Sequence, residues 1–428
     1  MKQNRTHHLK LATVGACLGV AVTGLAPLQA ETTAPAQDGK LDKVERENQE
    51  LRKRLEVLES LAQKEGLLAK SDAAAGTVLK AATESIFSGF VTASYFHDTS
   101  HPPTGISPGY LWNRKNDSIS LNKVKLTVAS PAVAASGDKW DVGYRASLIL
   151  GQDAPVVNSS AATLGFQNLR EAYVEMNIPI GTGLNVKAGE LISLLNYESG
   201  DGGAANDNFS QGYQWFFTGN GPSGGVQLGY ALTDWLDVKV RVENGLYAGP
   251  VDNNRSKSVM VAFGIKPMDK VWLSLIGHDG YENNLGLAHL SGGSLLAGWQ
   301  ATDKLHFGTE LDYENVRGGA VQPHTDSSVW STGLWVSYAL TEKLTPALRA
   351  EFLSDHDGKV AVPAYDLPGG FAANTGQSLS SLAFTLNYKP APNIKIQPEV
   401  RYDHSSFKTA FGTKQDRVIF GSGISYLF

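Results

Sequence analysis

Residues 140–148 read Trp-Asp-Val-Gly-Tyr-Arg-Ala-Ser-Leu, an alternation of apolar and polar side chains with a period of two. Successive side chains of a β-strand point to opposite faces of its sheet, so Trp140 and Arg145 are predicted to lie on opposite faces. The same alternation recurs in residues 236–243 (Leu-Asp-Val-Lys-Val-Arg-Val-Glu) and in residues 394–403 (Ile-Lys-Ile-Gln-Pro-Glu-Val-Arg-Tyr-Asp). One face carries charges and suits water, while the other is apolar and suits lipid or a packed core.

Segments of this kind follow one another from Ile86 to Phe428. We count about sixteen strands of about ten residues each, an even number and a length that lets a tilted strand cross a bilayer. The predicted strands start near residues 86, 118, 139, 168, 183, 224, 235, 256, 269, 293, 304, 328, 343, 378, 392 and 415. The pattern predicts an all-β fold, a transmembrane antiparallel β-barrel in contact with outer-membrane lipid.

Short and long connections alternate along this region. The short ones contain turn-forming residues, as in residues 232–234, 267–270, 301–304, 340–343 and 389–393. The others are longer and rich in Gly, Asn, Asp and Ser. Short periplasmic turns and long outer loops are typical of outer-membrane barrels, whereas the alternative, a soluble β-sandwich, does not require this alternation.

The composition is compatible with a barrel and argues against other classes. Hydrophobic residues make up 42% of the 428, and no run after the N-terminus reaches the ~18 apolar residues of a membrane-spanning helix. The net charge of −5 gives no reason to expect nucleic acid as a partner. Aromatic residues near the predicted strand ends are expected at the lipid headgroup level; they are Tyr95, Phe96, Trp140, Trp235, Trp272, Trp299, Trp330, Tyr338, Tyr388, Tyr402 and Tyr426.

The N-terminus has the features of a secretory signal peptide. Lys2 and Arg5 supply a charged start, residues 11–26 are apolar and small, and a cleavage site follows at Ala30. We therefore predict a signal peptide over residues 1–30; a membrane anchor is the alternative, but the apolar run is short for one. Cys17, the one cysteine, lies in this segment, so the mature chain is expected to form no disulfide.

A charged, helix-favouring stretch precedes the barrel. Residues 31–65 are predicted to form a periplasmic coiled-coil segment, and residues 66–85 a linker. In a parallel coil Glu47 would meet Arg52 and Arg54 would meet Glu59 of the partner helix, both pairs opposite in sign. The alternative is an amphipathic helix lying on its own barrel. The central seam positions are Val44, Asn48, Leu51, Leu55 and Leu58.

The chain ends in residues 418–428, Val-Ile-Phe-Gly-Ser-Gly-Ile-Ser-Tyr-Leu-Phe. Phe420, Ile424, Tyr426 and Phe428 fall on one face of this predicted strand. The segment resembles the C-terminal strand signal that the barrel-assembly machinery reads in outer-membrane proteins, with Phe428 as the terminal aromatic residue. To leave no open edge, the last strand must pair with the first, near residues 88–95.

Several pieces of the chain together resemble a known family, the putative β-barrel porin family 2 of outer-membrane porins. They are residues 89–95 (Gly-Phe-Val-Thr-Ala-Ser-Tyr), 121–126, 170–174, 187–190, 197–198, 208–210, 221–223, 243–245 and 252–254. The resemblance covers most of residues 86–428 and departs at the Gly-rich residues 200–203. It implies a porin, and a coiled coil before a barrel is similar to several trimeric porin types, including anion- and sugar-selective ones. A homotrimer is the expected assembly.

The segment Ile192–Gly221 is the third long outer loop in this strand count. In sixteen-stranded porins, by resemblance, that loop folds inward and narrows the channel. Here it carries Glu198, Asp201 and Asp207 and contains no Lys or Arg. The alternative is a solvated surface loop. Its aromatic residues Trp215, Phe216 and Phe217 could form a sugar-binding slide or could anchor the loop by packing.

Charged residues of both signs are predicted to face the lumen. Opposed acidic and basic walls would create a transverse field that tunes ion preference, whereas salt bridges that only stabilise the barrel are the alternative. The candidate pore-lining residues are Lys123, Lys125, Arg145 and Lys187 on early strands and Arg241, Arg349 and Arg401 on later strands, interleaved with Glu310, Asp312, Glu351, Glu399 and Asp403. This mixture argues against a strongly anion-specific channel.

The sequence therefore favours passive diffusion of small hydrophilic solutes or ions through a water-filled barrel. A sugar- or ion-selective channel of the same fold is an alternative, and so is a non-conducting tether between the outer membrane and the cell wall. An outer-membrane enzyme is not expected, because the histidines are scattered and none sits beside a nucleophile in a catalytic arrangement. No metal-binding spacing and no cofactor motif appear in the sequence.

Overall fold

The chain divides into two units, Met1–Thr77 and Val78–Phe428. The computed structural model describes residues 49–50, 53–54, 84–107, 113–158, 166–219, 221–246, 251–252, 254–282, 289–317, 326–355 and 376–428. In the first unit the described residues are helical, and Arg54 Nη2 donates to Glu50 Oε1 at 2.7 Å. The predicted signal peptide and the seam residues Val44, Asn48, Leu51, Leu55 and Leu58 lie outside the described residues.

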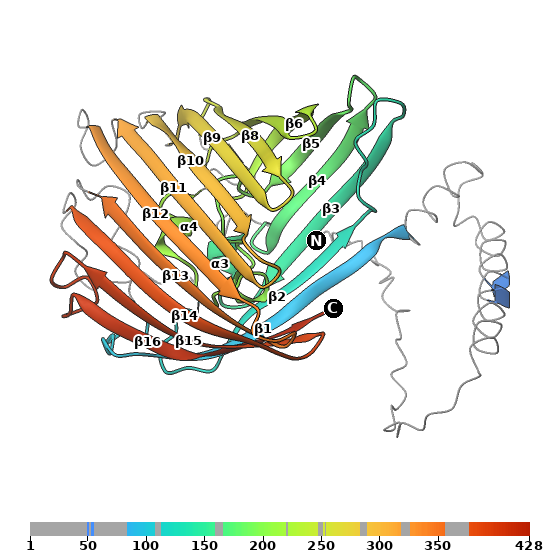
Figure 1. Cartoon of the computed structure of the whole chain (residues 1–428). Helices are drawn as coiled ribbons and strands as arrows, with labels where there is room; N and C mark the ends of the chain where they lie inside the picture. Colours follow the sequence, from blue (N-terminus) through green and yellow to red (C-terminus); the bar gives the residue numbers. More distant parts are fainter. Residues whose placement is uncertain are drawn as a thin grey trace, which may run out of the picture. The chain divides into compact units, whose positions relative to one another are not determined.

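The second unit is a closed β-barrel (Figure 1). Among the described residues sixteen antiparallel strands follow one another around the barrel in chain order, which confirms the predicted fold class. The strands are β1 (Ile86–Asp98), β2 (Ser120–Ala129), β3 (Asp141–Leu150), β4 (Leu169–Ile178), β5 (Leu184–Leu191), β6 (Ser223–Thr233), β7 (Leu236–Glu243), β8 (Ser258–Met268), β9 (Val271–Tyr281), β10 (His289–Gln300), β11 (Leu305–Arg317), β12 (Asp326–Tyr338), β13 (Leu344–Asp355), β14 (Gln377–Ala391), β15 (Ile394–Ser405) and β16 (Asp416–Leu427).

The last strand closes the barrel on the first. β16 pairs with β1 from Phe90, opposite Leu427, to Asp98, opposite Ile419. Beyond the strand, Gly89 N donates to Phe428 O at 2.8 Å and Phe428 N donates to Gly89 O at 3.0 Å. The predicted pairing of the terminal strand with residues 88–95 is therefore confirmed, and this closure gives the edge groups of β1 and β16 backbone partners.

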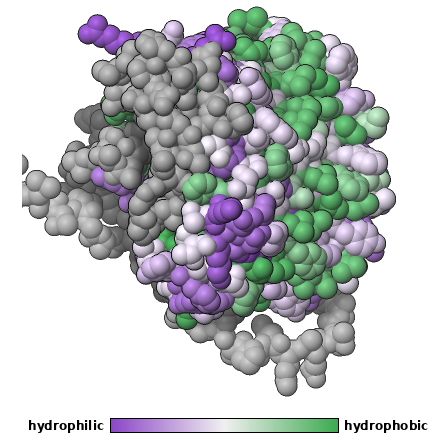
Figure 2. Space-filling model, turned by 90° about the vertical axis from the view of Figure 1, so that its left-hand side faces the viewer, coloured by the Kyte–Doolittle hydropathy of each residue, from purple (hydrophilic) through white to green (hydrophobic). Residues whose placement is uncertain are grey.

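Side chains alternate between the lumen and the outside along most of the length of the strands, and the alternation is interrupted at bulges such as that of β4 at Arg170 and Glu171. On β15, for example, Arg401 and Asp403 are almost fully buried whereas Val400 and Tyr402 are exposed. Figure 2 shows the result on one face of the barrel, where apolar residues cover much of the surface and strongly hydrophilic residues gather in separate patches. An apolar outer surface of this kind suits contact with lipid.

Two of the aromatic residues expected at the headgroup level are placed elsewhere. Phe96 faces inward, is 3% exposed and stacks on Phe209 with ring centroids 5.3 Å apart. Trp272 also faces inward and stacks on Tyr197. The expectation for both was wrong because position near a strand end does not decide which face a residue occupies; the strand register does.

The connections carry the helical turns of the described barrel. They are α3 (Ala154–Val157) between β3 and β4, and η1 (Gly202–Ala204) and α4 (Tyr213–Phe217) between β5 and β6. Among the described residues, no helix is long and apolar enough to span a membrane.

Candidate functional site

The connection between β5 and β6, which we call loop 3 (Ile192–Gly221), lies inside the barrel, and α4 is seen within it in Figure 1. It follows two other long connections, at the same end of the barrel, so the predicted order of the loops holds. Hydrogen bonds join loop 3 to inward-facing side chains of β2, β7 and β11 to β16. The loop is therefore attached to the lumen wall along much of its length.

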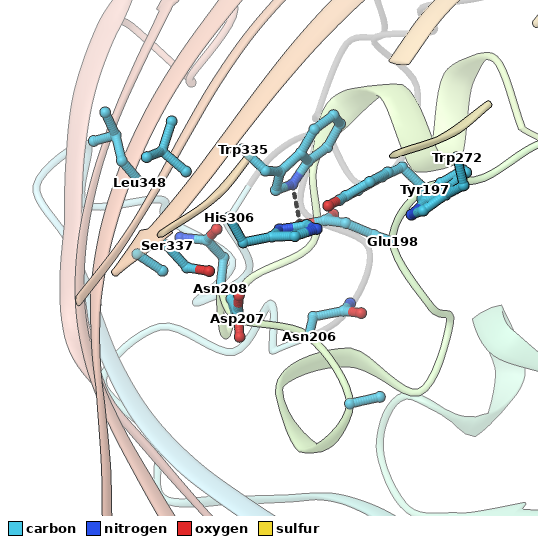
Figure 3. A pocket seen from close by; sticks show the side chains of 13 residues that line it. Tyr197, Glu198, Asn206, Asp207, Asn208, Trp272, His306, Trp335, Ser337 and Leu348 are labelled. Carbon is cyan, nitrogen blue, oxygen red and sulfur yellow. Dashed lines mark hydrogen bonds between the residues drawn. The ribbon is translucent and has the colours of Figure 1, made fainter. Parts of the chain in front are cut away.

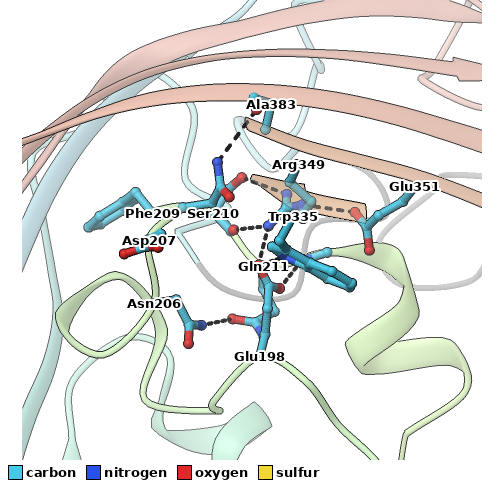
Figure 4. Close-up of polar contacts among 12 residues, drawn as sticks. Glu198, Asn206, Asp207, Phe209, Ser210, Gln211, Trp335, Arg349, Glu351 and Ala383 are labelled. Carbon is cyan, nitrogen blue, oxygen red and sulfur yellow. Dashed lines mark hydrogen bonds and ion pairs between the residues drawn. The ribbon is translucent and has the colours of Figure 1, made fainter. Parts of the chain in front are cut away.

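Arg349 on β13 is the central anchor of loop 3 (Figure 4). Its Nη1 donates to Glu198 Oε1 at 2.8 Å and to the carbonyl oxygen of Ser210, and its Nε lies 3.0 Å from Glu351 Oε2. Trp335 Nε1 donates to the same oxygen of Glu198 at 3.1 Å. Since the Arg349 side chain is 0% exposed, its charge is held by these carboxylates and not by water.

Carboxylates of the lumen wall accept hydrogen bonds from backbone N–H groups of loop 3. Glu399 on β15 accepts from the nitrogens of Phe209, at 2.7 Å, and Ser210, at 3.1 Å. Glu351 on β13 accepts from the nitrogen of Gln214 at 3.1 Å. A segment with little secondary structure has unpaired backbone donors when it is buried, and these carboxylates supply the partners.

Cationic side chains of the lumen wall donate hydrogen bonds to backbone carbonyl groups of loop 3. Arg401 Nη1 donates to Gln211 O at 2.7 Å, and Lys395 Nζ donates to Gly203 O at 2.8 Å. Charged side chains of both signs on β13 to β15 thus bind the backbone of loop 3: the carboxylates accept from its N–H groups, and the cations donate to its carbonyl groups.

Aromatic residues of α4 fix the loop by packing. Trp215 is 9% exposed and lies in a cluster with Ile149 of β3 and Val157 of α3. Phe217 lies in a second cluster with side chains of β12 to β14, among them Val329, Leu353 and Leu379. Of the two predicted roles for these aromatic residues, the packing of Trp215 and Phe217 fits an anchor; the Phe216 side chain lies outside the described residues.

The predicted lumen residues all point inward, and the structure gives most of them an ionic partner. The closest contacts are Lys123–Asp153 at 3.0 Å, Lys125–Asp201 at 2.6 Å, Arg145–Glu171 at 2.6 Å, Lys187–Glu175 at 3.4 Å, Arg241–Glu243 at 3.5 Å and Arg401–Asp403 at 2.6 Å. Arg349, Arg401, Lys125 and Arg241 contact loop 3 itself, the last through Ile192 O at 2.8 Å. Lys123 is buried in its own pair with Asp153.

Exposure divides these charges into two groups. Arg349, Arg401 and Arg241 are at most 4% exposed, so they act within the wall. The side chains of Arg145 and Lys187 keep 37% and 27% of their surface exposed. On loop 3, Glu198 is buried and Asp207 is exposed.

A cavity of about 310 Å³ lies between loop 3 and the wall (Figure 3). The sequence alone did not indicate that the residues lining it come together. Tyr197 of the loop stacks between Trp335 of β12, with centroids 4.6 Å apart, and Trp272 of β9, with centroids 6.0 Å apart. Burial raises the pKa of Tyr197 above its usual value, and the nearby carboxylates of Asp207 and Glu198 raise it further, so the hydroxyl stays neutral. The sequence did contain a signal for the position of Trp272. This residue lies on the same face of β9 as the polar residues Ser274 and His278, and polar residues of a barrel strand are expected to face the lumen.

Comparisons with known proteins agree with this architecture. The model of the family described as "Putative beta-barrel porin-2, OmpL-like" matches residues 86–428. No curated protein sequence matches the chain. The barrel is similar to the solved structures of OmpT from Vibrio cholerae in its trimer form and of an anion-selective porin from Comamonas acidovorans; each has a TM-score of 0.54 at 10% identity over 80% of this chain and 99% of that chain. It is also similar to the outer membrane channel DcaP of Acinetobacter baumannii, with a TM-score of 0.51 at 14% identity over 80% of this chain and 97% of that chain. At these identities the structural likeness shows the fold.

Proposed function

Because the chain belongs to the family of β-barrel porins whose model matches residues 86–428, we propose that it is a porin for passive diffusion of small hydrophilic solutes or ions. The family and the closed barrel establish a porin-type channel fold of the bacterial outer membrane. The finer proposal is that solutes pass through a barrel narrowed by loop 3.

The attachment of loop 3 by Arg349 carries this proposal. A loop that only covered the barrel mouth would need no partners on the lumen wall. Here the charged contacts of Glu198, Ser210 and Gln214 hold the loop inside the barrel against β13, where it occupies part of the lumen. Pore diameter and the groups that line a pore set which solutes pass, and a loop held in the lumen changes both.

Charged side chains of the lumen wall that remain partly exposed support weak ion selectivity. Lys239 of β7 retains 39% exposure of its side chain, close to the 35% of its partner Asp237. Lys187 and its partner Glu175 retain 27% and 19%. In both pairs a cation and a carboxylate lie side by side, so their effects on a passing ion partly cancel.

A homotrimer fits the family resemblance and the trimer form of the similar OmpT structure. In this proposal the coil residues Val44, Asn48, Leu51, Leu55 and Leu58 join three chains in the periplasm. The signal peptide would direct export, and Phe428 would be read by the barrel-assembly machinery.

Planar-bilayer recording with the purified mature protein tests the function. We expect stepwise conductance that appears in groups of three equal steps. A protein that is folded, as shown by its heat-shifted migration on a gel, yet never conducts would overturn the porin proposal. Conductance in single steps would support the porin function and contradict the proposed trimer.

A further inference from the structure

The cavity beside loop 3 is bounded on one side by an aromatic strip, which we define as Trp272, Tyr197 and Trp335 (Figure 3). Trp272 and Tyr197 are nearly parallel, with an interplanar angle of 11°. Trp335 is 6% exposed, whereas Trp272 is 36% exposed, so the free aromatic surface is at the Trp272 end. The cavity lies toward the end of the barrel that carries the short turns, because Trp272 and His306 each follow directly after the first residue of their strands.

Glycines of the wall make room for this strip. A Cβ added to Gly298 of β10, Gly308 of β11 or Gly333 of β12 would lie 2.2, 2.0 or 2.4 Å from an atom of an overlying ring of the strip. Gly298 and Gly308 are direct partners in the sheet. Three neighbouring strands thus lack side chains where the rings cover them, and any residue with a Cβ would push the rings into the cavity.

The rest of the cavity is lined by polar groups that are mostly uncharged. Asn206, Asn208, His306 and Ser337 line it, together with the exposed carboxylate of Asp207. Asn208 is 1% exposed, and its Nδ2 donates to Thr385 Oγ1 of β14 at 2.8 Å, so its amide is held by the wall and the accessible polar groups are those of Asp207, His306 and Ser337.

We propose that this cavity is a saccharide-binding subsite of the channel, an inference that rests on the proposed porin function. The C–H groups on one face of a pyranose ring would pack on the exposed surface of Trp272, because an aromatic face is electronegative and attracts such groups. Hydroxyl groups on the sugar edge would donate to the carboxylate of Asp207, and His306 and Ser337 would supply further hydrogen bonds.

The lining argues against two other ligand classes. The described lining residues include no Lys or Arg, so nothing compensates the charge of an anion. Of the two acidic lining residues, Glu198 is already bound by Arg349 and Trp335, which leaves Asp207 alone to attract a cation. A neutral polyhydroxyl ligand uses both the ring surface and the uncharged donors and acceptors, whereas an organic cation uses only Asp207 and the rings.

Current block in planar bilayers tests the subsite. We expect maltose, added to a potassium chloride solution, to interrupt the ion current with a frequency that rises with sugar concentration. Trp272→Ala should weaken maltose block about ten-fold, since it removes the exposed ring. Trp299→Ala is the matched control, because Trp299 follows Gly298 in the chain but points outward, and it should leave the block unchanged.

Gly308→Ala gives a second test that keeps all three rings. The added methyl group should displace Tyr197 from the wall and weaken maltose block while the barrel still closes. Equal block in wild type and Trp272→Ala would overturn the subsite. Block by tetramethylammonium and not by glucose or maltose, lost in Asp207→Asn, would assign the cavity to organic cations instead.

The two proposals fail in distinguishable ways. If the protein conducts ions but no sugar blocks the current, the porin proposal stands and the subsite proposal is rejected. If the protein does not conduct, the porin fails, and calorimetric titration of maltose into the detergent-solubilised protein decides the subsite separately. Heat of binding that disappears in Trp272→Ala would support it, and the absence of any binding heat would reject it.

Discussion

Arg349 of β13 and Glu198 of loop 3 are 151 residues apart in the chain, yet Arg349 Nη1 lies 2.8 Å from Glu198 Oε1. Their side chains are 0% and 3% exposed. A buried ion pair of this kind adds little net stability over apolar packing, but the loss of one partner leaves an uncompensated charge in the interior. The pair therefore specifies where loop 3 lies more than how stable the barrel is.

Arg349→Ala should release loop 3. It leaves the carboxylates of Glu198 and Glu351 without their cation, at a cost of about 3–5 kcal/mol to the docked loop. We expect larger or noisier single-channel currents from a barrel that still shows heat-shifted migration. Arg255→Ala, at an exposed arginine in the connection between β7 and β8, is the control and should conduct like wild type. Unchanged current in Arg349→Ala would show that loop 3 does not limit conductance.

Asp207→Lys should turn ion preference toward anions. Replacing a carboxylate by an ammonium changes the energy of a nearby ion by about 1 kcal/mol in a water-filled pore, roughly five-fold in the permeability ratio. Reversal potentials in a potassium chloride gradient measure the ratio. Asp303→Lys, in the exposed turn between β10 and β11, makes the same charge change outside the constriction and should have a smaller effect.

The structure changes which acidic residues best test selectivity. The double reversal Glu198→Lys with Asp201→Lys should also move preference toward anions, but both carboxylates are paired, with Arg349 and Lys125. That variant is expected to displace the loop as well, so a rise in conductance should accompany the change in selectivity. If neither Asp207→Lys nor the double variant alters the reversal potential, loop 3 is not at the constriction.

Lys125 and Asp201 should show energetic coupling. Lys125 Nζ lies 2.6 Å from Asp201 Oδ2, and this contact joins the loop to β2, which is five strands from Arg349's strand around the barrel. In a double-mutant cycle with Lys125→Ala and Asp201→Ala, we expect a coupling energy of about 0.5–3 kcal/mol from urea unfolding in detergent micelles. Additive effects of the two substitutions would mean that the contact contributes nothing to docking the loop.

Removal of Phe428 should impair assembly. The backbone of Phe428 exchanges two hydrogen bonds with Gly89, each worth about 0.5–1.5 kcal/mol, and the aromatic terminus is the predicted recognition signal. We expect less heat-modifiable barrel in the outer membrane. Phe420→Ala, which removes an outward-facing ring of the same strand, tests general loss of apolar surface and should impair assembly less. Equal losses would assign the effect to the strand and not to its end.

Deletion of residues 41–65 should weaken the oligomer and spare the barrel. The predicted coil of about three heptads is marginal alone and adds to an interface that the barrels already make. On gels the oligomer should dissociate at a lower temperature, while the heat-shifted migration of the barrel remains. An oligomer of unchanged heat resistance would remove the coil from the assembly.

The strand pattern was predictable because each strand carries its own information. The period-two alternation in residues 140–148 and 394–403 sets which side chains face the lumen, and it placed Arg145 and Arg401 inward. The alternation of turns and loops set the order of the strands around the barrel. Trp272 and Phe96 show the limit, since residues near a strand end were assigned to the lipid side without regard to register.

By itself the sequence determined the closed barrel, the position of loop 3 in the strand order and the inward charges, because these follow from local periodicity and chain order. Only the tertiary structure decided that Glu198 meets Arg349, that Asp207 stays exposed and that Tyr197 stacks between two tryptophans over glycines. These contacts join residues of loop 3 to strands more than 70 positions away, and no local pattern encodes which of many lumen groups a loop will touch. The identity of the partners depends on the shape of the closed barrel, which exists only once all sixteen strands have paired.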